Sequence, residues 1–374
     1  MKKIILTTLF LCCLNLITAQ DKIYVHTATA ANIITNSTYI DHPDLNNHPN
    51  APIVFCHVWN PNLMTPVYND KVDGLWYDPS AHKWAIYNED LSDIVIGAHF
   101  FVYIASDPND VITHVATPAT ISGSLNQVTT IDDPDFNNAD SGPYAVFSHY
   151  WNPHGIYNTN LDGFYYDNSI HRRQIYNEDN VTPIPTNAAY KILKNGSGVV
   201  ARFTHVSNAA NITGNFTLID NPNLNNNPNA TFVFSHYYGI SGHDAYVTHK
   251  ISAFYSGSLH KWALYTEDHS AFPSDAAIDI IVANPDPLAI NDIANLENIK
   301  LYPNPVANIA KITADQPIAH ISVFNSLGQN IQKLDFDTAQ KQIELPVVRF
   351  PKGIYTVNVT TQTGAKQVMK LIKK

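Results

Sequence analysis

The chain is poor in cysteine and in charge. Its 374 residues include 3 Cys, and charged side chains make up only 14%. Cys12 and Cys13 lie within the first twenty residues, so a mature chain would keep Cys56 alone. One cysteine cannot form an internal disulfide, and its alternation with Val54 and Val58 predicts a buried, apolar role. The fold must therefore be held by packing and hydrogen bonds.

Several chemical signatures are also missing. The sequence contains no nucleophile elbow, phosphate-binding loop or Cys/His metal motif, so no catalytic residue is assigned. No segment after residue 20 is apolar enough to cross a membrane. Residues 21–297 carry 28 acidic and 10 basic side chains, whereas residues 298–374 carry 4 acidic and 10 basic. The acidic body would repel a phosphate backbone, which argues against nucleic acid as a partner.

Residues 1–20 have the features of a signal peptide. Lys2 and Lys3 precede an apolar run from residue 4 to 17, and small residues follow before Gln20. A charged start, a short apolar core and small residues before the cut are what the Sec machinery recognises. We therefore expect export to the periplasm.

One stretch occurs three times. Residues 82–90 read HKWAIYNED, and related stretches follow at 171–179 and 260–268, each 89 residues later. The sequence has 20 Tyr, 16 Phe and frequent turn residues between short apolar runs, which predicts an all-β fold. We predict five or six strands per repeat, forming small antiparallel β-sandwich or barrel modules. The expected limits are 22–105, 110–195 and 200–283, followed by a linker at 284–298.

Each module contains a predicted hairpin whose return arm is the repeated stretch. In the first module, Trp84 shares a strand face with Ile86, which predicts that both point into the core. The second module has Arg173 in place of Trp84. The packing or exposure of that position must therefore differ in the second module.

The recurring His and acidic residues invite an active-site hypothesis. Glu89 and Asp90 are adjacent, however, and on a strand they point to opposite faces, so they cannot flank one glycosidic bond. His82 and Glu89 are seven residues apart, which also separates them on a continuous strand. We therefore predict a role for the acidic pair at the strand end. His57, between two aromatic residues on its face, is predicted to be a buried histidine rather than a ligand.

Calcium is the one cofactor that the sequence leaves open. Each module has an oxygen-rich loop, at 41–47, 132–138 and 220–226, and oxygen ligands suit this cation. The loops lack the EF-hand pattern, and Asx-turns explain them without metal. The expectation is no cofactor, with calcium as the alternative.

Aromatic residues at strand ends are the candidate ligand contacts. Trp59 and Trp151 each precede Asn-Pro, which favours partial exposure. Tyr238 is the equivalent in the third module, and Trp76 lies on the first arm of a hairpin. Flat aromatic faces beside Asn and Asp suit either a sugar or a protein contact.

The end of the chain resembles a known family. Residues 299–374 predict a small β-sandwich of immunoglobulin-like size, and they are similar to the type A C-terminal sorting domain of the type IX secretion system of Bacteroidetes. The residues that carry the resemblance include Tyr302, Pro303, Asn304, Pro305, Gly328, Gly353, Tyr355 and Gly364. The resemblance implies handling by the type IX machinery and delivery across the outer membrane, either attached to the surface or released.

The three modules resemble an uncharacterised repeat domain of secreted bacterial proteins. The similarity lies in residues 57–61, 74–77 and 84–90. It implies domain limits and no activity. Because three copies raise avidity for a repeated surface, we predict a non-catalytic binding or adhesion protein whose partner is a glycan or a surface protein. The alternatives are a secreted hydrolase acting on carbohydrate or peptide, and a structural surface spacer.

Overall fold

The computed structural model describes residues 20–139, 142–196, 198–285, 299–325, 329–362 and 366–374. Residues 1–19 of the predicted signal peptide and residues 286–298 of the predicted linker lie outside this part of the chain. Two compact units are present, at 1–291 and 292–374. Strands dominate both, and the helices among the described residues are the short 3₁₀ turns η1 (Pro61–Leu63), η2 (Pro108–Asp110) and η3 (Ile240–Gly242). The predicted all-β class is confirmed.

Each module contributes seven strands in the same order. The first module has β1 (Lys22–Thr27), β2 (Ile33–Ile34), β3 (Ser37–Tyr39), β4 (Ile53–Val58), β5 (Asp73–Asp78), β6 (Lys83–Asn88) and β7 (His99–Ile104). The second has β8 (Val111–Val115), β9 (Ile121–Ser122), β10 (Val128–Thr130), β11 (Ala145–Tyr150), β12 (Asp162–Asp167), β13 (Arg172–Asn177) and β14 (Ala189–Lys194). The third has β15 (Ala201–Val206), β16 (Ile212–Thr213), β17 (Phe216–Leu218), β18 (Thr231–Tyr238), β19 (Ile251–Ser256), β20 (Lys261–Thr266) and β21 (Ala277–Pro285).

The repeated stretch is the return arm of a hairpin, as the sequence predicts. β6, β13 and β20 pair antiparallel with β5, β12 and β19. The first histidine of each copy turns the chain, because His82, His171 and His260 have φ of 55°, 54° and 53°. Behind the turn, the indole rings of Trp84 and Trp262 are fully buried. The polar turn stays at the surface and the apolar arm packs into the core, which positions the hairpin.

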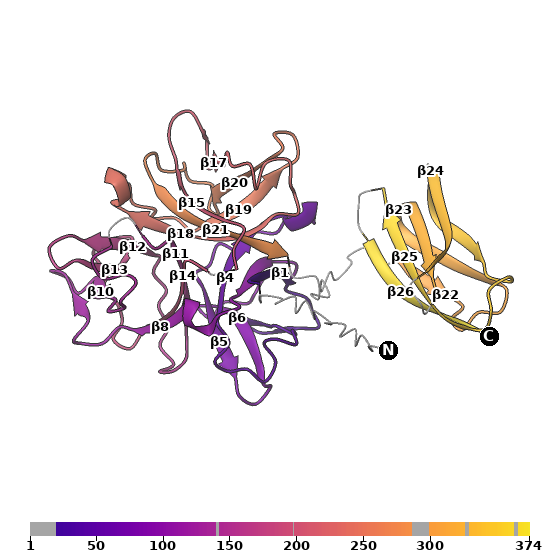
Figure 1. Ribbon diagram of the computed structural model, residues 1–374, viewed down its shortest axis with the longest axis horizontal. Helices are drawn as coiled ribbons and strands as arrows, with labels where there is room; N and C mark the ends of the chain where they lie inside the picture. The colour runs from indigo at the N-terminus through magenta and orange to yellow at the C-terminus, as the bar shows by residue number, and fades with distance from the viewer. Residues whose placement is uncertain (1–19, 140–141, 197, 286–298, 326–328, 363–365) are drawn as a thin grey trace, which may run out of the picture. The chain divides into compact units, whose positions relative to one another are not determined.

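The three modules share their sheets instead of folding as separate bodies. β5 of module one pairs parallel with β11 of module two, β12 pairs with β18 of module three, and β19 pairs with β4 of module one. Each module thus adds a hairpin to the next, and the third returns to the first. Figure 1 shows the labels of β4, β11 and β18 near the centre of this unit, with the hairpins around them. We call the three contacts the first, second and third junctions.

The ends of the body also meet. β1 pairs antiparallel with β7 and parallel with β21, where Lys22 lies opposite Asn284. A large apolar cluster contains Val54 of module one, Val146 of module two and Phe232 of module three. Burying apolar side chains between modules stabilises the ring at roughly 25 cal/mol for each Å² removed from water. One core therefore spans the repeats.

The second unit is a five-stranded antiparallel sheet. Its strands are β22 (Lys300–Tyr302), β23 (Ile309–Phe324), β24 (Asn330–Pro346), β25 (Gly353–Thr361) and β26 (Lys366–Lys373). Asn304 holds the last strand, because its amide donates to Lys370 O at 2.6 Å and its oxygen accepts from Ile372 N at 2.8 Å. The Tyr355 hydroxyl donates to Pro351 O at 2.7 Å. Gly328 and Gly364 lie outside the described residues.

Candidate functional site

A buried histidine–glutamate pair joins the modules at each junction. His149 Nδ1 of module two lies 3.2 Å from Glu89 Oε1 of module one. His236 Nδ1 of module three lies 2.5 Å from Glu178 Oε1 of module two. His57 of module one completes the ring by pairing with Glu267 of module three. Both partners come from strands or strand ends that the parallel pairing brings together.

Each glutamate at the first two junctions receives further hydrogen bonds. The Tyr87 hydroxyl donates to Glu89 Oε1 at 2.8 Å, and the backbone N–H of Asn158 donates to Oε2 at 2.9 Å. Glu178 is held in the same way by Tyr176 at 2.9 Å and by the N–H of Val247 at 3.0 Å. Buried carboxylates need such donors because an unpaired charge in a core is costly. Because each glutamate accepts hydrogen bonds from two modules, it stabilises the contact between them.

At the first junction a third ionisable group joins the pair. His149 Nε2 also lies 3.1 Å from Asp162 Oδ2, so the ring stands between two carboxylates. Burial alone would lower the pKa of His149, but hydrogen bonds and charge from Asp162 and Glu89 raise its pKa to about 10. His149 is therefore an imidazolium at neutral pH that donates from both ring nitrogens. Burial raises the pKa of Asp162.

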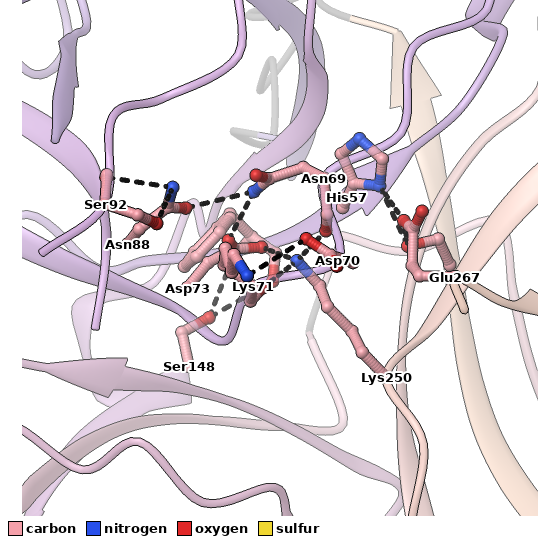
Figure 2. Close-up of polar contacts among 12 residues, drawn as sticks. His57, Asn69, Asp70, Lys71, Asp73, Asn88, Ser92, Ser148, Lys250 and Glu267 are labelled. Atoms are coloured by element: carbon pink, nitrogen blue, oxygen red, sulfur yellow. Dashed lines mark hydrogen bonds and ion pairs between the residues drawn. The ribbon is translucent and has the colours of Figure 1, made fainter. Parts of the chain in front are cut away.

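The third junction uses a different donor. Gly74 and Gly163 leave room for tyrosine hydroxyls, since a Cβ at Gly74 would lie 2.5 Å from Tyr87 Oη. Module three has Ser252 there instead, and its hydroxyl donates to Glu267 Oε1. Burial alone would raise the pKa of Glu267, but the charges and hydrogen bonds around it, His57 foremost, lower that pKa to about 2. Figure 2 shows His57 facing Glu267.

Module three reaches module one through a second charged contact. Lys250 Nζ donates to Asp73 Oδ2 at 2.5 Å, to Asn69 O at 2.7 Å and to Lys71 O. An ammonium has three donors, so all are used. Asp73 also accepts from Asn69 Nδ2 at 2.7 Å. Burial raises the pKa of Asp73, and the Lys250 charge opposes that effect.

A cavity of about 130 Å³ lies where the three modules meet. Equivalent side chains from the modules line it, including Phe55, Phe147, Phe234, His57, His149, Asp73, Asp162 and Lys250. A neighbouring cavity of about 110 Å³ shares Asp162, Phe234 and Lys250 and adds His236. Perturbed ionisable groups beside a cavity mark a candidate binding site.

A further position differs between junctions. Phe101 of module one packs on Trp262 with ring centroids 5.8 Å apart. At the equivalent place, Lys191 of module two holds its ammonium 5.7 Å from the centre of the Trp84 ring. In module three the position is Asp279. Burial raises the pKa of this carboxyl and the Arg173 charge opposes the rise, so the resulting pKa is about 6. Arg173 thus stands in place of Trp84 and Trp262 at the junction where the facing residue of the next module is Asp279.

Arg173 itself is fully buried among aromatic rings. Its guanidinium carbon lies 4.3 Å from the centroid of Tyr237, 4.9 Å from that of Phe136 and 5.4 Å from that of Phe164. None of its side-chain nitrogens has a hydrogen-bond partner among the described residues. Cation–π attraction and the Asp279 charge are what offset its desolvation. The sequence predicts that packing or exposure at this position differs in the second module, and the difference is a buried cation in place of an indole ring.

The residues predicted to contact a ligand lie in aromatic clusters at the junctions, which we call the junction patches. The first patch contains Trp76, Trp151 and Tyr157, the second Tyr165, Tyr238 and Tyr246, and the third Trp59, Phe254 and Tyr68. Trp59, Trp151, Tyr238 and Trp76 are half-buried inside them. The outer ring of each patch is a tyrosine that the sequence reasoning did not single out, although it precedes the hairpin at the same place in every module.

Those outer tyrosines are the exposed part of the patches. Tyr68 and Tyr157 are each 41% exposed, and Tyr246 is 38% exposed. Each packs against a half-buried ring: Tyr246 stacks on Tyr238 with centroids 4.6 Å apart, and Tyr68 and Tyr157 lie tilted against Trp59 and Trp151. Their 89-residue spacing is the signal that could have revealed them.

The oxygen-rich loops are held by their own side chains. Asn46 Nδ2 donates to Asp41 Oδ1 at 2.7 Å, and Asn225 repeats the bond to Asp220 at 2.7 Å. Lys83 bonds Asp41 at 2.8 Å from the hairpin. Within the described ranges, no group of three or more His, Cys, Asp or Glu residues is arranged to hold a metal ion. The expectation of no cofactor, with calcium at these loops as the alternative, stays a prediction.

The structure separates the residues of the active-site hypothesis. His82 is exposed at a hairpin turn, whereas Glu89 and His57 are 2% exposed and belong to different junctions. His57 is buried, as expected, but it is paired with Glu267 of another module. Strand alternation does not reveal this pairing, because it relates residues within one module only. A recurring His on one strand and a recurring Glu after another were the available signal.

Comparison with family models gives the modules a family. A model described as a domain of unknown function, DUF7452, matches residues 13–94, 74–162 and 163–282. The chain belongs to this family. A second model, a secretion system C-terminal sorting domain, matches residues 300–374. The resemblance to a type IX sorting domain behind three repeats is thereby confirmed.

The C-terminal sorting domain indicates where the protein is exported. Such a domain directs export to the cell surface or secretion, and it implies handling by the type IX machinery. Among the described residues, no helix has the length and apolar character to span a membrane. The predicted location is confirmed.

Two solved structures of type IX secretion proteins show weak similarity to the chain. PorZ, a surface component of the type IX secretion system of Porphyromonas gingivalis, has 10% identity and a TM-score of 0.19, covering 80% of this chain and 41% of PorZ. Latent PorU of the same organism has 11% identity and a TM-score of 0.17, covering 95% and 34%. The chain thus spans less than half of either protein, and neither carries an argument about this one. None of the curated proteins matches the chain.

Proposed function

We propose that the DUF7452 ring is a non-catalytic binding and adhesion module that the sorting domain delivers to the cell surface or beyond. The observation that carries the proposal is the exposed tyrosine at the same place in all three junction patches. Tyr68, Tyr157 and Tyr246 each present a ring face supported by a half-buried aromatic residue. A rigid aromatic surface binds a sugar ring or a protein side chain at small entropic cost.

Three weak sites on one rigid body favour a repeated ligand. A polymer or surface that engages two patches at once gains effective concentration at the second, so affinity rises without new contacts. The patches are related but not identical, since the rings around Tyr68 include His269 whereas Tyr246 accepts a hydrogen bond from Asn180. We expect each patch to have its own preference within one ligand class.

The experiment compares single and triple tyrosine variants on a glycan array and in pull-down from biofilm matrix. The triple Tyr→Ala variant should lose binding, and each single variant should lose at least about tenfold in avidity, as multivalent contacts do. Ile170→Ala is the matched control, because Ile170 is 46% exposed but lies on a hairpin turn. A folded triple variant that binds like the natural chain would overturn the proposal.

The structure favours this proposal over the alternatives. The hydrolase alternative requires carboxylates or histidines that converge in one cleft. The ring uses His57 and Glu89, two of the residues weighed for that role, to join different modules. A structural spacer has no need for matching exposed aromatic rings. The three patches therefore support binding as the leading function.

A further inference from the structure

Asp162 lines the central cavity, and one of its carboxyl oxygens accepts no hydrogen bond from the described residues. At the first junction the His149 ring is one basic group between two carboxyl groups, those of Glu89 and Asp162. Asp162 Oδ2 accepts from Asn158 Nδ2 at 2.7 Å, from Tyr190 Oη at 2.8 Å and from His149. Asp162 Oδ1 is buried and has no partner among the described residues. A buried carboxylate oxygen in this state calls for a donor.

The third junction shows which donor fits. There Lys250 of module three places its ammonium on Asp73 of module one and on two backbone carbonyls. Asp162 is the module-two counterpart of Asp73, 89 residues further on. Val72 of module one stands where Lys250 stands and lines the same cavity as Asp162. The first junction therefore has the carboxyl group of this arrangement, with Val72 in place of the lysine.

We propose that the central cavity binds a small primary alkylammonium ion at Asp162. Its N–H groups replace the missing lysine donors on Oδ1, and its alkyl part lies against the apolar lining that Phe147 and Leu161 contribute. A volume of about 130 Å³ suits a ligand of about six heavy atoms, the size of benzene in a comparable cavity. Because Oδ1 is covered in the free protein, binding turns the Asp162 carboxylate toward the cavity. This site is separate from the junction patches.

The binding test uses the whole chain and methylammonium or butylammonium chloride. Calorimetry should give one saturable site, and the melting temperature should rise with amine concentration. Potassium chloride controls for ionic strength, and tetramethylammonium controls for charge without N–H donors. Asp162→Asn should weaken butylammonium binding at least about tenfold. Equal shifts with potassium or tetramethylammonium would overturn the assignment of a primary ammonium.

A second test needs no added ligand. Val72→Lys supplies the missing ammonium from within the chain, so it should raise the melting temperature and abolish butylammonium binding. Val72→Met is the matched control, because it has similar length and no charge. The proposal fails if Val72→Met melts as high as Val72→Lys, or if the Val72→Lys variant binds the amine like the natural chain. This comparison stands even if Asp162→Asn does not fold.

Discussion

Replacing His149 tests whether the charged pairs hold the ring together. In His149→Gln, the buried carboxylates of Glu89 and Asp162 lose the imidazolium between them. Removing one partner of a buried pair costs about 3–5 kcal/mol, so the free energy of unfolding should fall by about that amount at pH 7. Because both carboxylates lie at a junction between modules, the loss should appear in unfolding of the whole ring.

The stabilisation that His149 contributes should decrease as the pH rises. The pKa of His149 rises from 6.5 to about 10 on folding, so its stabilisation is complete below pH 6.5 and is lost as the pH rises through 10. At about 1.4 kcal/mol per pKa unit, the interval corresponds to at most about 5 kcal/mol. The stability gap between the natural chain and His149→Gln should therefore be widest near pH 6.5 and narrow toward pH 10.

Urea unfolding followed by tryptophan fluorescence at pH 6.5, 8 and 10 measures this gap. His82→Gln is the control, because His82 is exposed on a turn and its loss should leave the profile unchanged. Groups that do not interact with His149 titrate alike in both proteins and cancel in the difference. A gap that stays constant from pH 6.5 to 10, or that is absent, would refute the charged state assigned to His149.

Three further predictions concern other parts of the chain. Arg173→Trp should destabilise the protein because Asp279 loses its buried countercharge, and the added Asp279→Phe should restore stability with a coupling of about 0.5–3 kcal/mol in urea unfolding; additive effects would contradict the pairing. Deleting residues 299–374 should leave the protein in the periplasm, and normal surface delivery of the truncated chain, seen by cell fractionation, would sink the sorting role. If calcium occupies the loops near Asp41 and Asp220, a chelator should lower the melting temperature, whereas an unchanged midpoint removes that prediction.

Local patterns predicted the elements of the ring well. The strand from 53 to 59, the hairpin arms and the burial of Trp84 follow from period-two alternation and turn residues, which depend on neighbours in the chain. The sorting domain was predicted for the same reason, because its motifs are short and ordered. The short hairpin of β2 and β3 was missed, since two- and three-residue strands show no period.

The sequence by itself determined three all-β repeats, their hairpins and the route of export. Only the tertiary structure decided that the repeats share sheets in a closed ring, because parallel pairing between β5 and β11 joins residues 75 apart in the chain, such as Gly74 and His149. That pairing turned the strand-end role expected of Glu89 into a contact with His149 of the next module. The parallel pairings at the junctions also made Trp59 and Trp151 members of junction patches. Asp162 at the centre keeps one oxygen without a partner among the described residues. Contacts between repeats depend on packing geometry, which no pattern within one repeat contains.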